Sequence, residues 1–134
     1  LIHGDFHLGN LFFGRHGETP LIIADWQMMM RGSGMLDVSS FLTSCMGPGM
    51  RRAVETELLS GYHSVLLERG TADYTYVQCL SEYRLSMFFP LMVTVAAFGN
   101  IEDEVPDDRT DAELSAYVER LSAALEDHNI SALL

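Results

Sequence analysis

The chain has 134 residues, of which 48% are hydrophobic and 20% charged, a globular composition that argues against a disordered or collagen-like chain. Acidic residues outnumber basic ones 19 to 8, for a formal charge of −11, and all eight basic residues are arginine. So few cations argue against a phosphate-backbone footprint, and we expect neither nucleic acid nor an anionic membrane as a partner.

The compartment follows from the cysteines and the apolar runs. Cys45 and Cys79 lie far apart and form no CxxC pair, which predicts free thiols in a reducing, cytoplasmic compartment. The longest apolar stretch, Leu85–Phe98, is shorter than the roughly 18 residues of a membrane helix and predicts a buried core helix. The chain starts at Leu1 rather than Met, without a signal sequence, and we expect it to be part of a longer protein.

The first 34 residues predict a small β-hairpin. Leu11–Phe13 and Leu21–Ala24 are short apolar runs separated by the polar, glycine-containing segment 14–20. Two such runs around a loop of this length are typical of antiparallel strands.

From residue 35 the apolar spacing becomes helical. It predicts about four helices: one over 35–46, one from Ala53 that ends at Gly70, one from a cap at Thr71 or Asp73 to Gly99 with a break at Pro90, and a last one opened by a capping box at Thr110 after an acidic loop over 100–109. The predicted fold is therefore a single α+β, mainly helical domain over residues 1–134.

The chemistry-bearing residues lie near the N-terminus. His3, Gly4 and Asp5 are followed by Asn10 in the pattern H-G-D-x-x-x-x-N, and Asp25 ends the second apolar run in Ile-Ile-Ala-Asp-Trp. The second strand of the predicted hairpin runs back along the first. It would therefore bring Asp25 to the end of the hairpin at which the H-G-D loop enters the first strand. Two carboxylates and an amide oxygen can therefore converge, which is the set that phosphoryl transfer from ATP with Mg²⁺ requires.

These motifs resemble the aminoglycoside phosphotransferase and choline kinase-like superfamily, which is related to the protein kinases. HGDFHLGNLFF resembles its catalytic loop, IIADWQ resembles its metal-binding segment, and Met35–Val38 resembles the start of the following helix. The D-W-Q form leans toward the ecdysteroid kinase-like branch. The resemblance implies a protein-kinase-like C-lobe, with the catalytic loop and metal segment in residues 1–34, a helical part in 35–128, and no N-lobe.

The resemblance also implies roles for the three central residues. Asp5 matches the catalytic base, and Asn10 and Asp25 match the two Mg²⁺ ligands. From the residues alone, turn formation remains an alternative explanation for each of them, because Asp and Asn favour loops.

Five further residues match supporting positions of the family. His3 matches a loop-bracing histidine, His7 a residue near the transferred phosphate, and Asp37 a buried acid that binds loop backbone. Phe12 and Ala24 match positions beside the adenine. Exposure to solvent for His7, plain core packing for Phe12 and helix capping for Asp37 remain open.

The resemblance implies an enzyme that transfers the γ-phosphate of ATP to a hydroxyl of a small molecule, with ATP and Mg²⁺ as cofactors. The acceptor, for example an aminoglycoside, choline, a sugar or a steroid, is not specified. The alternative is a non-catalytic, kinase-derived helical interaction module that pairs with a second copy. In either case we expect apolar residues of the hairpin and of 85–98 to contact a missing N-lobe or a second copy, and the fragment alone to be inactive.

Overall fold

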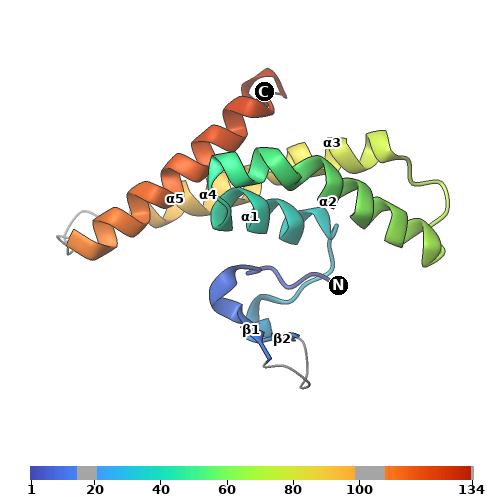
Figure 1. The fold of residues 1–134 in the computed structure, drawn as a ribbon, viewed down its shortest axis with the longest axis horizontal. Helices are drawn as coiled ribbons and strands as arrows, with labels where there is room; N and C mark the ends of the chain where they lie inside the picture. The colour runs from blue at the N-terminus through green and yellow to red at the C-terminus, as the bar shows by residue number, and fades with distance from the viewer. Residues whose placement is uncertain (15–20, 99–107, 134) are drawn as a thin grey trace.

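The computed structural model describes residues 1–14, 21–98 and 108–133. It is mainly helical with one two-stranded antiparallel sheet, as predicted, and the hairpin projects from one side of the helices (Figure 1). The likeness to a kinase C-lobe stays a prediction. In chain order the elements are a 3₁₀ turn Leu8–Asn10, strands β1 (Leu11–Phe13) and β2 (Leu21–Ile23), a 3₁₀ turn Trp26–Met28, helices α1 (Met35–Cys45), α2 (Pro48–Glu68), α3 (Tyr76–Ser86), α4 (Phe88–Phe98) and α5 (Asp108–Asp127), and a 3₁₀ turn Ile130–Leu133.

Two antiparallel pairings close the N-terminal segment on itself. Leu11 pairs with Ile23 in the β1–β2 ladder, and Ile2 pairs with Met30 through two backbone hydrogen bonds. The H-G-D loop and the residues around Asp25 lie between these two pairings. The predicted hairpin is therefore confirmed, with Ala24 just outside the second strand.

The helix ends follow the local sequence, with two corrections. α2 begins at Pro48, five residues before the predicted start at Ala53, because proline is well suited to the first position of a helix, where its missing N–H costs nothing. The capping box of α3 is formed by Thr75 and Gln78, so the predicted cap at Thr71 or Asp73 is wrong. Thr75 is the cap because its side-chain oxygen accepts the Gln78 N–H.

Pro90 splits the predicted long helix, but three residues earlier than its own position. α3 ends at Ser86 and α4 begins at Phe88. Proline cannot donate to the carbonyl four residues before it and its ring collides with that carbonyl. The helix therefore breaks at Met87, which leaves Pro90 in the first turn of α4.

The core is built around α1, which packs against α2, α3, α4 and α5. Its buried side chains come from three helices, the junction between α3 and α4, and the C-terminal turn, and are Met35, Leu42, Leu59, Cys79, Tyr83, Met87 and Ile130. Within the described residues, none of the helices has the length and apolar character that crossing a bilayer requires.

The apolar face that we expected to need a cover is exposed. Phe12 and Phe13 on β1 are 57% and 70% exposed, and Met92 and Val95 on α4 are 59% and 63% exposed. The prediction of a buried core helix over 85–98 therefore holds only in part, because α4 packs on α1 and α3 with one face and exposes the other. The hairpin loop with His16 and residues 100–107 of the acidic loop lie outside what the structure describes. α5 already starts at Asp108, so Thr110 lies inside this helix and the predicted cap at Thr110 is wrong.

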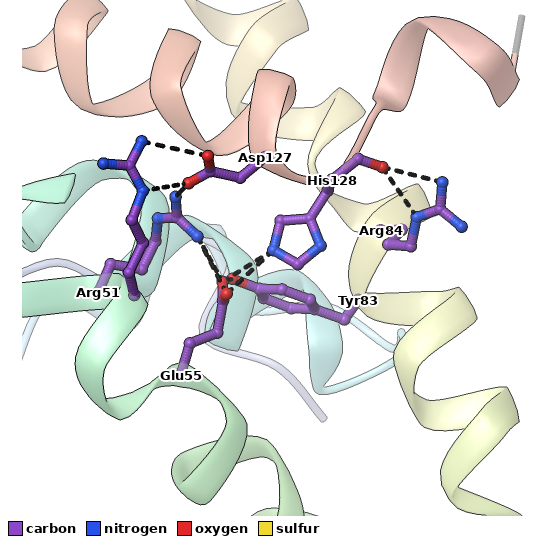
Figure 2. A network of polar contacts seen from close by, with 7 residues as sticks. Arg51, Glu55, Tyr83, Arg84, Asp127 and His128 are labelled. Atoms are coloured by element: carbon purple, nitrogen blue, oxygen red, sulfur yellow. Dashed lines mark hydrogen bonds and ion pairs between the residues drawn. The ribbon is translucent and has the colours of Figure 1, made fainter. Parts of the chain in front are cut away.

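A buried network of charges joins α2, α3 and the end of α5 (Figure 2). Glu55 accepts hydrogen bonds from Arg51 Nη1 at 2.9 Å, from the Tyr83 hydroxyl at 2.5 Å and from His128 Nε2 at 3.0 Å. Arg51, only 1% exposed, also pairs with Asp127. Burial alone would raise the pKa of Glu55, but the hydrogen bonds from His128, Tyr83 and Arg51 outweigh it and lower the pKa to about 2.

Candidate functional site

One carboxylate from the first turn of α1 holds the backbone of the H-G-D loop. Asp37 Oδ2 accepts the His3 N–H at 2.6 Å and Oδ1 accepts the Gly4 N–H at 2.9 Å. Gly4 has a φ of 82°, and a Cβ atom there would collide with the Met28 carbonyl, so the turn requires glycine. Asp37 thus makes a contact of the kind that the resemblance implies.

We expect Asp37→Asn to lower the free energy of unfolding by about 1–3 kcal/mol, because asparagine has one acceptor oxygen where the loop uses two. The matched control is Asp73→Asn, since Asp73 is exposed and its φ of 59° also suits asparagine. Denaturant unfolding followed by Trp26 emission measures the change. Equal unfolding midpoints for Asp37→Asn and the wild type would show that Asp37 does not hold the loop.

Ala24 is held from both sides, by His3 and by Asn10. Its N–H donates to the Asn10 carbonyl at 2.9 Å, and its carbonyl accepts from His3 Nε2 at 2.8 Å. His3 Nδ1 accepts the Asp5 N–H at 3.3 Å, so the proton of this buried imidazole lies on Nε2. The two hydrogen bonds of Ala24 connect the loop to the return segment of the hairpin, and the bond between Asp5 and His3 lies within the loop.

Asp25 follows directly after Ala24, whose backbone is hydrogen-bonded to His3 and Asn10. Its backbone is left-handed, with a φ of 61° and a ψ of 59°, and its side chain is exposed. A non-glycine residue in this region costs about 1–2 kcal/mol, and such strain is concentrated at functional sites. Trp26, the next residue, packs its ring 4.7 Å from that of His3.

A second set of contacts lies within the H-G-D loop itself and joins Asp5, His7 and Asn10. Asn10 Nδ2 donates to the Asp5 carbonyl at 2.9 Å, and it lies 3.5 Å from Asp5 Oδ2. His7 Nδ1 accepts the Gly9 N–H at 3.0 Å, and His7 Nε2 lies 3.6 Å from Asp5 Oδ2. Asp5 and His7 side chains are each 45% exposed, so both are accessible to a ligand.

The donor set suits Mg²⁺ bound together with phosphate. Because Nδ2 of Asn10 faces the Asp5 carbonyl, Oδ1 is the atom that can serve as a ligand, and Asp25 offers a carboxylate one residue from the Asn10–Ala24 hydrogen bond. The described residues contain no group of three or more His, Cys, Asp and Glu side chains able to hold a metal.

The two residues expected beside the adenine lie on the hairpin. Phe12 pairs with Ile22 across the ladder and is 57% exposed, so the alternative of plain core packing is wrong. Ala24 is half-buried, and both its N–H and its carbonyl are hydrogen-bonded to residues of the loop.

A cavity of about 980 Å³ adjoins the loop, between it and α1, α4 and α5. Asp5 and His7 lie on its loop side, whereas Asn10 and Asp25 are not part of its lining. Its helical walls contribute a mixture of apolar, hydroxyl and charged side chains: Ser40, Ser44 and Cys45 from α1, Phe89, Pro90, Val93 and Thr94 from α4, and Glu113, Leu114, Tyr117 and Arg120 from α5.

Sequence reasoning missed these cavity residues. They come from three helices and form no motif, and the periodicity of α5 indicated only that Leu114 and Tyr117 share a face. Arg120 in particular gave no signal, because its partner is the backbone carbonyl of Ser44 in another helix.

Comparison with family models shows where the chain belongs. It is a member of the DUF1679 family, described as "Uncharacterized oxidoreductase dhs-27", whose model matches residues 1–128. Neither the curated proteins nor the solved structures gave a match.

This description corrects the expected enzyme class. The prediction of a kinase-like phosphotransferase is wrong, because the family is named as an oxidoreductase. The physical reason for the error is that two carboxylates and an amide specify an oxygen-rich site for a cation and its bound anion. They do not specify which bond reacts there.

Proposed function

We propose that the H-G-D loop and Asp25 bind the phosphates of ATP together with Mg²⁺, and that the adjoining cavity holds a small molecule with a hydroxyl group. The observation that carries this proposal is the pair of hydrogen bonds on Ala24, which ties Asp25 to the loop of Asp5 and Asn10. The resemblance to the aminoglycoside phosphotransferase and choline kinase-like superfamily supports it. We assign binding and not phosphoryl transfer to this site, because the family's description names an oxidoreductase.

Each group has a defined part in this binding. Asn10 Oδ1 and Asp25 would hold Mg²⁺, which when bound supplies positive charge against the phosphate oxygens. Asp5, half-exposed at the cavity, accepts a hydrogen bond from the hydroxyl of the second ligand. The exposed ring of Phe12 offers a surface on which a base can stack. We place the function in the cytoplasm, where Cys45 and Cys79 stay reduced.

The test uses Trp26, the single tryptophan of the chain, which follows Asp25 directly. We expect ATP with Mg²⁺ to change Trp26 emission saturably, and calorimetry to give the same dissociation constant. ATP with EDTA, Mg²⁺ alone, NAD⁺ and NADP⁺ are the comparisons, and each is expected to bind at least about tenfold more weakly. Binding of NAD⁺ or NADP⁺ without binding of Mg²⁺–ATP would contradict the proposal and favour the dinucleotide chemistry of an oxidoreductase.

A second candidate function is supported by the exposed apolar side chains of the hairpin and α4. Exposed apolar surface of this kind marks interaction sites. The chain would then be a helical interaction module that pairs with a covering domain or with a second copy. This candidate predicts that the titration above detects no nucleotide binding. It also predicts that the protein sediments as a dimer in analytical ultracentrifugation.

A further inference from the structure

Arg120 presents a cation to the cavity from α5. Its Nε donates to the Ser44 carbonyl at 2.5 Å, in the last turn of α1. A guanidinium has five N–H donors, and in residues 1–14, 21–98 and 108–133 this is the one polar contact that Arg120 makes. The Nη groups therefore remain as donors for a molecule in the cavity that Arg120 lines.

Much of the remaining lining is apolar. The apolar side chains come from the loop, the segment after β2, α4 and α5, and are Phe6, Leu8, Met28, Phe89, Pro90, Val93 and Leu114. A guanidinium next to such walls is stabilised most by a charge-assisted hydrogen bond to an anion. Asp5 also lines the cavity, and its half-exposed carboxylate disfavours a ligand with several negative charges.

We propose that the cavity binds a small amphiphile with an apolar body and a single anionic head group, and that Arg120 determines the preference for that head group. This inference rests on the proposed occupation of the cavity by a small molecule and names the chemistry of that molecule. The apolar body lies along Phe89, Val93 and Leu114, while the head group accepts from the Nη atoms.

Two dyes that differ in the head group test this proposal. Anilinonaphthalene sulfonate carries a sulfonate on an aromatic body, and N-phenyl-1-naphthylamine has that body without the charge. We expect Arg120→Gln to weaken binding of the sulfonate dye by about 10- to 100-fold, as for losing a hydrogen bond to a charged group. The neutral dye should change by less than about twofold. Glutamine can still donate to the Ser44 carbonyl, so the packing of α5 on α1 is kept.

Three further variants complete the experiment. Arg120→Lys keeps the charge and is expected to retain the preference for the sulfonate dye. Arg69→Gln removes the same charge from an exposed position at the end of α2 and should affect neither dye. Val93→Trp fills the cavity and should weaken both.

An equal decrease in affinity for both dyes in Arg120→Gln would overturn the proposal. A purely structural role of Arg120 would affect binding of the two dyes alike, whatever their head group. A sulfonate dye unaffected by Val93→Trp would overturn it as well, since the dye would then bind outside the cavity. The Mg²⁺–ATP titration of the wild type decides the nucleotide function separately, so failure of one proposal is distinguished from failure of the other.

Discussion

Glu55→Gln is expected to lower the free energy of unfolding by about 3–5 kcal/mol at neutral pH. The change removes the carboxylate partner of Arg51 on α2, and this 1% exposed guanidinium then keeps only Asp127 as an ion-pair partner among the described residues. Removing one partner of a buried ion pair costs about this much. Denaturant unfolding of both proteins measures the difference. The control is Glu57→Gln, which makes the same change at an exposed position of the same helix and should shift the midpoint little.

The same carboxylate predicts how stability depends on pH. The pKa of Glu55 in the folded chain lies near 2, below its ordinary value of 4.5, so the unfolded chain takes up the proton first as the pH falls. The stabilisation is therefore complete above about pH 4.5 and is lost as the pH falls toward 2, by about 3 kcal/mol in all. Glu55→Gln should lose this part of the acid dependence, whereas Glu57→Gln should keep it. A wild-type midpoint that does not change between pH 5 and pH 2.5 would contradict the arrangement in Figure 2.

Asp25→Asn is expected to weaken binding of Mg²⁺–ATP by more than about 100-fold, beyond the 10- to 100-fold typical of losing an outer-shell partner of a metal site. Asparagine tolerates the left-handed backbone of Asp25 but removes the negative charge that would bind Mg²⁺ in the proposed function. The Trp26 titration measures the loss.

Asp25→Gly separates binding from folding. Glycine removes the carboxylate and also relieves the backbone strain at φ 61°, so the free energy of unfolding should stay equal or rise by up to about 1 kcal/mol. Binding of Mg²⁺–ATP should be lost all the same. Retained binding in both variants would show that Asp25 is not a ligand of the metal.

Several local features of this protein could be predicted from its amino-acid sequence. The hairpin follows from two apolar runs around a polar loop, and α2 ends just before Gly70, as predicted, where a φ of 90° favours glycine. The H-G-D-x-x-x-x-N spacing predicted that Asp5 and Asn10 meet, and Asn10 does bond to the Asp5 carbonyl. Residues that are close in sequence have few ways to be arranged, and turn and helix geometry therefore specify their contacts.

The contacts between residues far apart in the sequence could not be predicted and became known from the three-dimensional structure. Glu55 is bonded by His128, 73 positions away, and Arg120 finds the Ser44 carbonyl 76 positions away. The i, i+4 pair of Arg51 and Glu55 is visible in the sequence, but its burial and its partners on α3 and α5 are not. The cavity likewise depends on how the loop and three helices pack. These contacts follow from the packing of helix faces around α1, which no local pattern of residues encodes.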